Sequence, residues 1–105
     1  MIEWCVIYTE KAIDDLEGLD NSIIIRVEKA IRKVSKNPLP NIEGGYGKPL
    51  GNSNKSKLAG LMKIKLKSCG IRIVYQLIRS ESIMKIIVIS IREDGIVYEE
   101  AEKRI

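Results

Sequence analysis

Residues 61–78, with the sequence LMKIKLKSCGIRIVYQLI, decide the fold because they have the pattern of two strands joined by a short turn. Within 61–67, apolar and basic residues alternate strictly from Met62 to Lys67, which is the side-chain period of a strand that buries one face. Ser, Cys and Gly at 68–70 supply a turn, and a β-branched run continues the alternation to residue 78. The first strand should turn three apolar residues to the core: Met62, Ile64 and Leu66. The stretch therefore predicts an antiparallel hairpin with one apolar and one cationic face.

Two further strands flank this hairpin along the chain. Residues 2–8 alternate in the manner of a strand, with Trp4 and Tyr8 turned inward. Residues 83–91 are almost continuously apolar, which suits a central strand that is covered on both faces. Residues 37–54 are rich in Pro, Gly and Asn, and they predict an irregular loop before the hairpin.

Helices are expected near both ends of the chain. Thr9 can cap a short helix, and Asn21 or Ser22 can cap a longer one whose apolar residues recur at spacings of three and four. Gly95 should break the last strand before a short, charged helix over 98–105. The sequence thus predicts an α+β fold. An N-terminal strand and a helical hairpin pack on a twisted, mainly antiparallel sheet of about four strands, followed by a short C-terminal helix.

Length and composition bound the class of protein. At 105 residues, 45% of them hydrophobic, the chain fits one domain over 1–105 with a core of ordinary size. It opens without a basic leader, and no apolar run approaches the roughly 20 residues that span a bilayer, so we expect a cytoplasmic protein without a membrane partner. Cys5 and Cys69 lie far apart and histidine is absent, which favours reduced thiols, no metal site and no cofactor. We expect Cys5 in the core and Cys69 in a turn.

Charge is distributed unevenly along the chain. Between residues 44 and 80 there are eight basic residues and no acid, whereas acids outnumber bases eight to six before this segment and six to four after it. The basic residues are Lys48, Lys55, Lys57, Lys63, Lys65, Lys67, Arg72 and Arg79. The pattern predicts that the middle of the chain alone forms a cationic surface, suited to a polyanion such as RNA. The alternative is a lysine-rich solvated face that only maintains solubility.

Three cations on the hairpin are expected to form a site. Lys63 and Lys65 are two residues apart on one strand, so their Cα atoms are about 7 Å apart and their side chains share a face. The tight turn brings Arg72 of the next strand alongside them. Mutual repulsion in such a cluster favours the neutral amine of a lysine, in which form it can act as a base, and the charged members can hold a phosphate. Lys67 extends the basic face.

The motifs of the second half of the chain resemble those of the RelE family of toxins. The resemblance rests on 57-KLAG-60, on 63-KIKLKSCGIRIVYQ-76, on 87-IVIS-90 and on 97-VYEEAEKRI-105. It implies a RelE-like microbial ribonuclease-type fold over 1–105. It also implies the toxin of a type II toxin-antitoxin system, a metal-independent endoribonuclease, or mRNA interferase, that cuts messenger RNA on the ribosome. The implied partners are a cognate RelB-like antitoxin, the ribosome and mRNA, with DNA contacted only through the antitoxin complex.

The resemblance also implies a role for each matching residue. Lys65 would be the general base towards the ribose 2′-hydroxyl, while Lys63 and Arg72 would stabilise the phosphate. Tyr98 would stack with and orient a nucleotide, and Arg92 would protonate the leaving 5′-oxygen. The segment from 90 to 98 is shorter than in the best known RelE toxins, so the match of Arg92 requires a gap. The remaining RNA-binding residues would be Lys55, Lys57 and Lys67.

Two other functions fit parts of the pattern. One is that of the ParE branch of the same superfamily, which shares the fold and inhibits DNA gyrase without cutting RNA. The other is an RNA-binding module that does not cleave. A gyrase inhibitor has no need of a base beside phosphate ligands, so the set of Lys63, Lys65, Arg72 and Tyr98 favours the ribonuclease. We expect these four side chains to face solvent.

Overall fold

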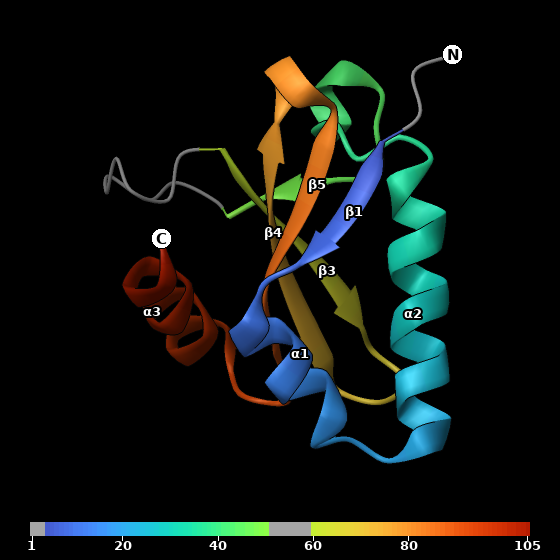
Figure 1. Ribbon diagram of the computed structural model, residues 1–105, viewed down its shortest axis with the longest axis vertical. Coiled ribbons are helices and arrows are strands. Elements are labelled where there is room, and N and C mark those ends of the chain that lie inside the picture. Colours follow the sequence, from blue (N-terminus) through green and yellow to red (C-terminus); the bar gives the residue numbers. More distant parts are fainter. Residues whose placement is uncertain (1–3, 51–59) are drawn as a thin grey trace.

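A computed structural model describes residues 4–50 and 60–105, which form a five-stranded mixed sheet covered by helices on both faces (Figure 1). The strand order is β1-β5-β4-β3-β2, in which β1 is parallel to β5 and the other neighbours are antiparallel. The strands are β1 (Cys5–Tyr8), β2 (Lys48–Pro49), β3 (Leu61–Leu66), β4 (Ile71–Ile78) and β5 (Ile83–Ser90). The helices are α1 (Glu10–Glu17), α2 (Asn21–Ser35) and α3 (Asp94–Arg104), with single 3₁₀ turns at Asn41–Glu43 and Arg79–Glu81.

This arrangement confirms the predicted fold class and corrects three of its details. The sheet has a fifth strand, β2, inside the segment predicted as an irregular loop. Its Pro49 is tolerated because β2 is an edge strand, where a missing N–H leaves no ladder bond unmade. The cap of α2 is Asp20 rather than Asn21 or Ser22. Gly95 lies in the first turn of α3, where N–H groups have no intrahelical partner, so this helix begins earlier than predicted.

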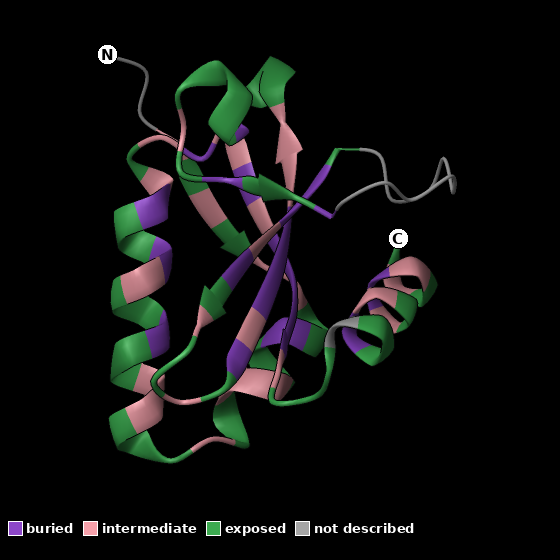
Figure 2. Ribbon diagram, turned by 180° about the vertical axis from the view of Figure 1, so that it is seen from behind, coloured by how far each residue is buried: buried purple, intermediate pink, exposed green. Residues whose placement is uncertain are grey.

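The first core lies between the sheet and the pair of helices α1 and α2. The buried face of α2 carries Val27, Ile31 and Val34, at the helical spacing that the sequence shows. Opposite them, the sheet contributes the predicted inward set from β3 and β4, including the fully buried Tyr75. Tyr8 packs against this core from β1, as expected. Figure 2 shows the buried residues along the central strands and on the side of α2 that faces them.

A second, smaller core lies on the other face of the sheet, under α3. Val97 and Ala101 of α3 are buried there against Leu61, Val74, Ile87 and Val88, with Tyr98 partly buried at its edge. Because β5 meets apolar side chains on both faces, its continuously apolar sequence is explained. The α3 face of the sheet is also the one that carries Lys63, Lys65 and Arg72, since these alternate with the residues of the first core.

A bulge in β5 changes which of its residues point to each face. Val74 of β4 pairs with Val88, whereas the next residue, Tyr75, pairs with Ile86, so Ile87 is an extra residue in β5. An extra residue reverses the alternation beyond it. Ser90 consequently lies directly opposite Arg72.

The expected core position of Cys5 is wrong, because Cys5 is exposed. It lies on the edge strand β1 and alternates with Val6 and Tyr8, which pack on the first core. The alternation is therefore right, but α3 covers β4 and β5 rather than the outer face of β1. Cys69 lies in the β3–β4 turn as expected, half-buried against the first core. No helix among the described residues is long and apolar enough to cross a membrane.

Candidate active site

The β3–β4 hairpin places three of the predicted cations together. Lys65 pairs directly with Arg72 across the two strands, and Lys63 lies two residues away on the same face. Residues opposite each other in an antiparallel pair have Cβ atoms about 5 Å apart. Like charges in that position repel each other and destabilise the sheet. An anion bound between the two side chains would relieve this repulsion.

Lys67 adds a fourth cation to this region. It follows the last residue of β3 and is exposed. Together with Lys65 and Arg72 it lines a hollow of about 230 Å³ whose other walls are Leu66, Gly70 and Ile71. The positive φ of Gly70, 66°, suits a glycine at the tight turn that brings the strands together. We call Lys63, Lys65, Lys67 and Arg72 the hairpin cations. Lys55 and Lys57 lie outside the described residues.

Tyr98 of α3 lies against Lys63. The ammonium of Lys63 donates a hydrogen bond of 3.1 Å to the Tyr98 hydroxyl, and its nitrogen lies 5.7 Å from the centre of the ring. The Tyr98 side chain also packs against the second core. The prediction that all four side chains face solvent is therefore wrong for Lys63, Arg72 and Tyr98, which are half-buried because α3 lies over this part of the sheet. Lys65 is exposed as predicted.

Arg92 contributes to the site through its main chain. Nη1 of Arg72 donates to the carbonyl oxygen of Arg92 at 2.9 Å, and the Arg92 N–H donates to Oγ of Ser90 at 3.0 Å. The side chain of Arg92 is exposed and lines a second hollow, of about 250 Å³, with Ser90, Glu100 and Arg104. Sequence reasoning missed Ser90 and the carbonyl of Arg92. The sequence signal for this contact is Ser90, at the end of an apolar strand and two residues before Arg92.

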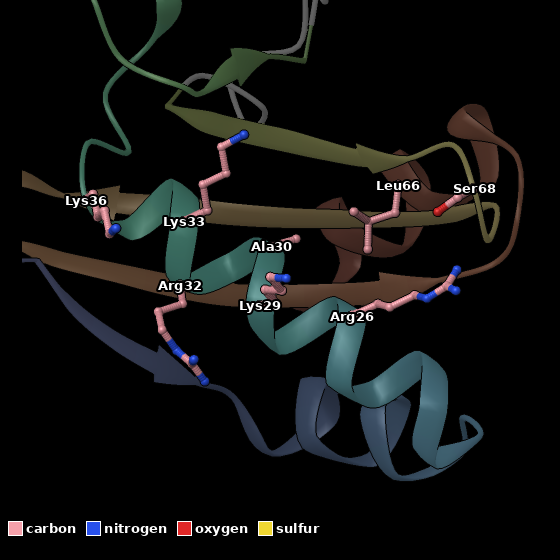
Figure 3. Close-up of a pocket in the computed structure, with 8 residues that line it drawn as sticks. All are labelled: Arg26, Lys29, Ala30, Arg32, Lys33, Lys36, Leu66 and Ser68. Atoms are coloured by element: carbon pink, nitrogen blue, oxygen red, sulfur yellow. The ribbon is translucent and has the colours of Figure 1, made fainter.

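A second cationic surface lies on the opposite face of the sheet, between α2 and β3. Figure 3 shows Lys33 rising from α2 and Arg26 extending towards the end of the sheet that carries Ser68. The hollow measures about 550 Å³, and its lining residues are Arg26, Lys29, Ala30, Arg32, Lys33, Lys36, Leu66 and Ser68. The prediction that only the middle of the chain is cationic is thus wrong. The charge count over the first 43 residues hid this surface, because it combined the bases of α2 with acids that lie elsewhere in the structure.

Within the described residues, no group of three or more Cys, Asp or Glu side chains is placed to hold a metal ion, and the chain has no histidine. The functional groups gathered on this face of the sheet are the ammonium, guanidinium and phenol groups of Lys63, Lys65, Arg72 and Tyr98. Such groups can bind a phosphate, transfer a proton and stack on a nucleobase.

The chain was compared with known proteins by sequence and by structure. No protein-family model matches the chain. It is 32% identical over 101 residues, 93% of each protein, to the mRNA interferase toxin RelE of Escherichia coli K12. It resembles the structure of a mutant of E. coli toxin RelE in the free state, with a TM-score of 0.76 and 26% identity over 99% of both chains. It also resembles such a mutant in complex with a peptide of the antitoxin, RelBc, with a TM-score of 0.68 and 27% identity over 99% of both chains.

Proposed function

The chain belongs to the RelE family of toxins, and on that premise we propose that it is the toxin of a type II toxin-antitoxin system that cuts messenger RNA on the ribosome. The similar E. coli protein is an mRNA interferase. The observation that carries the proposal here is the direct pairing of Lys65 with Arg72, next to a Lys63 that contacts Tyr98. This arrangement offers a base, phosphate ligands and a ring for stacking on one face.

The proposed reaction is an attack of a ribose 2′-hydroxyl on the adjacent phosphorus. Lys65, as the free amine, takes the proton from the 2′-hydroxyl while the new bond between the 2′-oxygen and phosphorus forms. Lys63 and Arg72 stabilise the negative charge that develops on the phosphate oxygens. The bond from phosphorus to the 5′-oxygen breaks, and Arg92 is proposed to protonate that oxygen. The products are a 2′,3′-cyclic phosphate and a 5′-hydroxyl, and no step calls for a metal ion.

The remaining site residues are proposed to hold the RNA. Tyr98 presents a ring on which a base can stack, and base–aromatic stacking contributes about 1–3 kcal/mol per base. Lys67 borders the hollow of Lys65 and Arg72, where it is placed to contact a neighbouring phosphate. Lys55 and Lys57 are proposed to extend the same footprint. Action on translating ribosomes would place the protein in the cytoplasm.

We propose a RelB-like antitoxin as the protein partner. The structure of a RelE mutant with an antitoxin peptide supports this, because the present chain resembles that toxin over nearly its whole length. The partner is expected to be a small, partly disordered protein with an acidic segment that folds on contact, and to mediate any contact with DNA. Expression of the chain without such a neighbour should arrest growth.

The experiment that tests the proposal separates the three functions considered. The purified protein is added to a translation reaction that reports transcript length, and in parallel to a gyrase supercoiling assay. Shortened transcripts in the translation reaction and unchanged supercoiling are expected. Loss of supercoiling with intact transcripts would favour the ParE-like function. Binding of RNA without cleavage and without gyrase inhibition would favour the third function, that of an RNA-binding module.

A further inference from the structure

Arg104, the last residue of α3, joins three elements of the fold. Its Nη1 donates to Asp15 Oδ2 and to the carbonyl oxygen of Ile87, both at 2.8 Å, and its Nη2 donates to Asp15 Oδ1 at 3.3 Å. Its Nε donates to Glu100 at 2.8 Å. The guanidinium is thus bonded to α1, to β5 and to its own helix. Only 12% of the Arg104 side chain is exposed.

Asp15 of α1 completes this connection from the other side. Its Oδ2 accepts the main-chain N–H of Ile89 at 3.0 Å as well as the bond from Arg104. The pairing of β1 with β5 ends at Ile86, and Asp15 bonds the edge of β5 three residues further on, at Ile89. The hydrogen bond to Asp15 raises the pKa of Arg104 further, and the hydrogen bond from Arg104 lowers the pKa of Glu100. We call this pair the Asp15–Arg104 clasp.

The clasp adds polar bonds to a short helix that packs on the second core. Among the α3 side chains that the structure describes, the buried ones are Val97 and Ala101, and the Ala101 side chain is a single methyl group. A helix of eleven residues is shorter than the about 12–15 residues at which isolated helices become marginally stable in water. Tyr98 lies six residues before Arg104, about 9 Å along the helix axis. The clasp therefore lies near one end of α3 and the Tyr98 ring nearer the other.

The same clasp also acts on the other side of the site. Ile87, whose carbonyl Arg104 bonds, is the extra residue of the bulge in β5. Ile89, which bonds Asp15, follows two residues later. Just beyond it, Oγ of Ser90 accepts the N–H of Arg92, and the carbonyl oxygen of Arg92 accepts the bond from Arg72. One ion pair thus fixes both the helix that carries Tyr98 and the strand end that supports Arg72.

We propose that Asp15 and Arg104 are positioning residues of the candidate active site. They act through Tyr98 and through the end of β5, and neither needs to touch RNA. The activity part of this inference rests on the proposed function. The structural part does not, because it concerns the placement of α3 and of the Tyr98 ring.

Hydrogen exchange followed by NMR tests the structural part. Asp15→Asn keeps an oxygen for the Ile89 N–H but removes the charge, and Arg104→Lys keeps the charge but cannot make the bonds of a planar guanidinium. In both variants the amides of α3 should exchange at least about tenfold faster, with β3 and β4 unchanged. Contacts between the Tyr98 ring and the Lys63 side chain should weaken. The matched control is Glu43→Gln, which breaks the exposed ion pair of Glu43 with Arg79 and should leave α3 as it is.

The activity part is tested by a double-mutant cycle on single-turnover cleavage. Arg104→Lys should slow cleavage at least about tenfold in the wild-type background and have a smaller effect when Tyr98 is already alanine, because only the part transmitted through the end of β5 then remains. A purely structural role would lower the rate equally in both backgrounds, and that result would overturn the proposal. So would faster exchange throughout the protein, or unchanged exchange in α3. If the wild-type protein cuts no RNA, the proposed function fails, and the exchange and ring contacts alone decide whether the clasp positions Tyr98.

Discussion

At the scale of single residues, the two uses of Tyr98 can be separated by one substitution. Tyr98→Phe keeps the ring for stacking and removes the hydroxyl that accepts the hydrogen bond from Lys63. We expect the single-turnover rate of cleavage to fall less than about tenfold in Tyr98→Phe and far more in Tyr98→Ala, because stacking is the larger contribution. Equal losses in the two variants would show that the hydroxyl, and with it the position of Lys63, is what the reaction requires.

The hairpin cations could be predicted from sequence because two simple rules fix them. Alternation puts Lys63 and Lys65 on one face, and the four-residue connection at 67–70 sets Arg72 opposite Lys65. The acceptor for Arg72 could not be predicted in this way. It is the main-chain carbonyl of Arg92, whose place depends on a bulge in β5 and on the turn that follows. Cys5 shows a related limit, since alternation assigns a face but does not say whether another element covers it.

At the scale of secondary-structure elements, the start of α1 offers a test of the predicted cap. Oγ1 of Thr9 accepts the N–H of Ala12 at 3.1 Å, which satisfies one of the unpaired donors of the first turn. Thr9→Ala should lower the free energy of unfolding by about 1 kcal/mol. For a domain of this size the melting temperature should fall by roughly 4–8 °C, as measured by calorimetry.

The control for this change is Thr9→Ser, which retains the hydroxyl and should keep most of the stability. An equal loss in Thr9→Ser would mean that the methyl group of Thr9, rather than the cap, stabilises the start of α1. Cleavage should be unaffected by either change, because Thr9 contributes no atom to the hairpin cations.

The elements that sequence reasoning placed well are those with a strong period. β3, β4, β5 and the two N-terminal helices fall where their patterns predict, within a few residues. The elements that it missed or shifted depend on tertiary contacts. β2 is two residues long and contains a proline, and it exists because β3 offers an edge to pair with. α3 begins earlier than predicted because Val97 and Ala101 pack in the second core. No local sequence pattern predicts that contact.

At the scale of the whole molecule, positive charge lies on both faces of the sheet. The hairpin cations occupy the α3 face and the bases of α2 occupy the other. If Lys63, Lys67 and Arg72 each neutralise one phosphate of a single strand while Lys65 acts as the free amine, the logarithm of the binding constant should fall with the logarithm of salt concentration at a slope of about −2. Fluorescence anisotropy of a short RNA oligonucleotide, measured over a range of potassium chloride, reports this slope.

Two variants assign the slope to one face. Lys67→Ala should make it shallower by about 0.7, since one phosphate contact is lost. Lys29→Ala, on the opposite face, should leave it unchanged. If Lys29→Ala changes the slope and Lys67→Ala does not, the RNA lies along α2, and the hairpin cations do not form the footprint.

The central claim is that Lys65 acts on the 2′-hydroxyl while its neighbours hold the phosphate. The measurement that tests it most directly is the single-turnover rate of mRNA cleavage on the ribosome by Lys65→Ala, with Lys67→Ala as the matched control. Because general-base catalysis typically contributes about 10²- to 10⁴-fold and acts only in the transition state, the rate of Lys65→Ala should fall by about that factor with binding nearly unchanged. Lys67→Ala should lose binding and keep the rate at saturation. Cleavage by Lys65→Ala at the wild-type rate, with Arg92→Ala equally active, would contradict the claim and leave the hairpin cations as a docking surface.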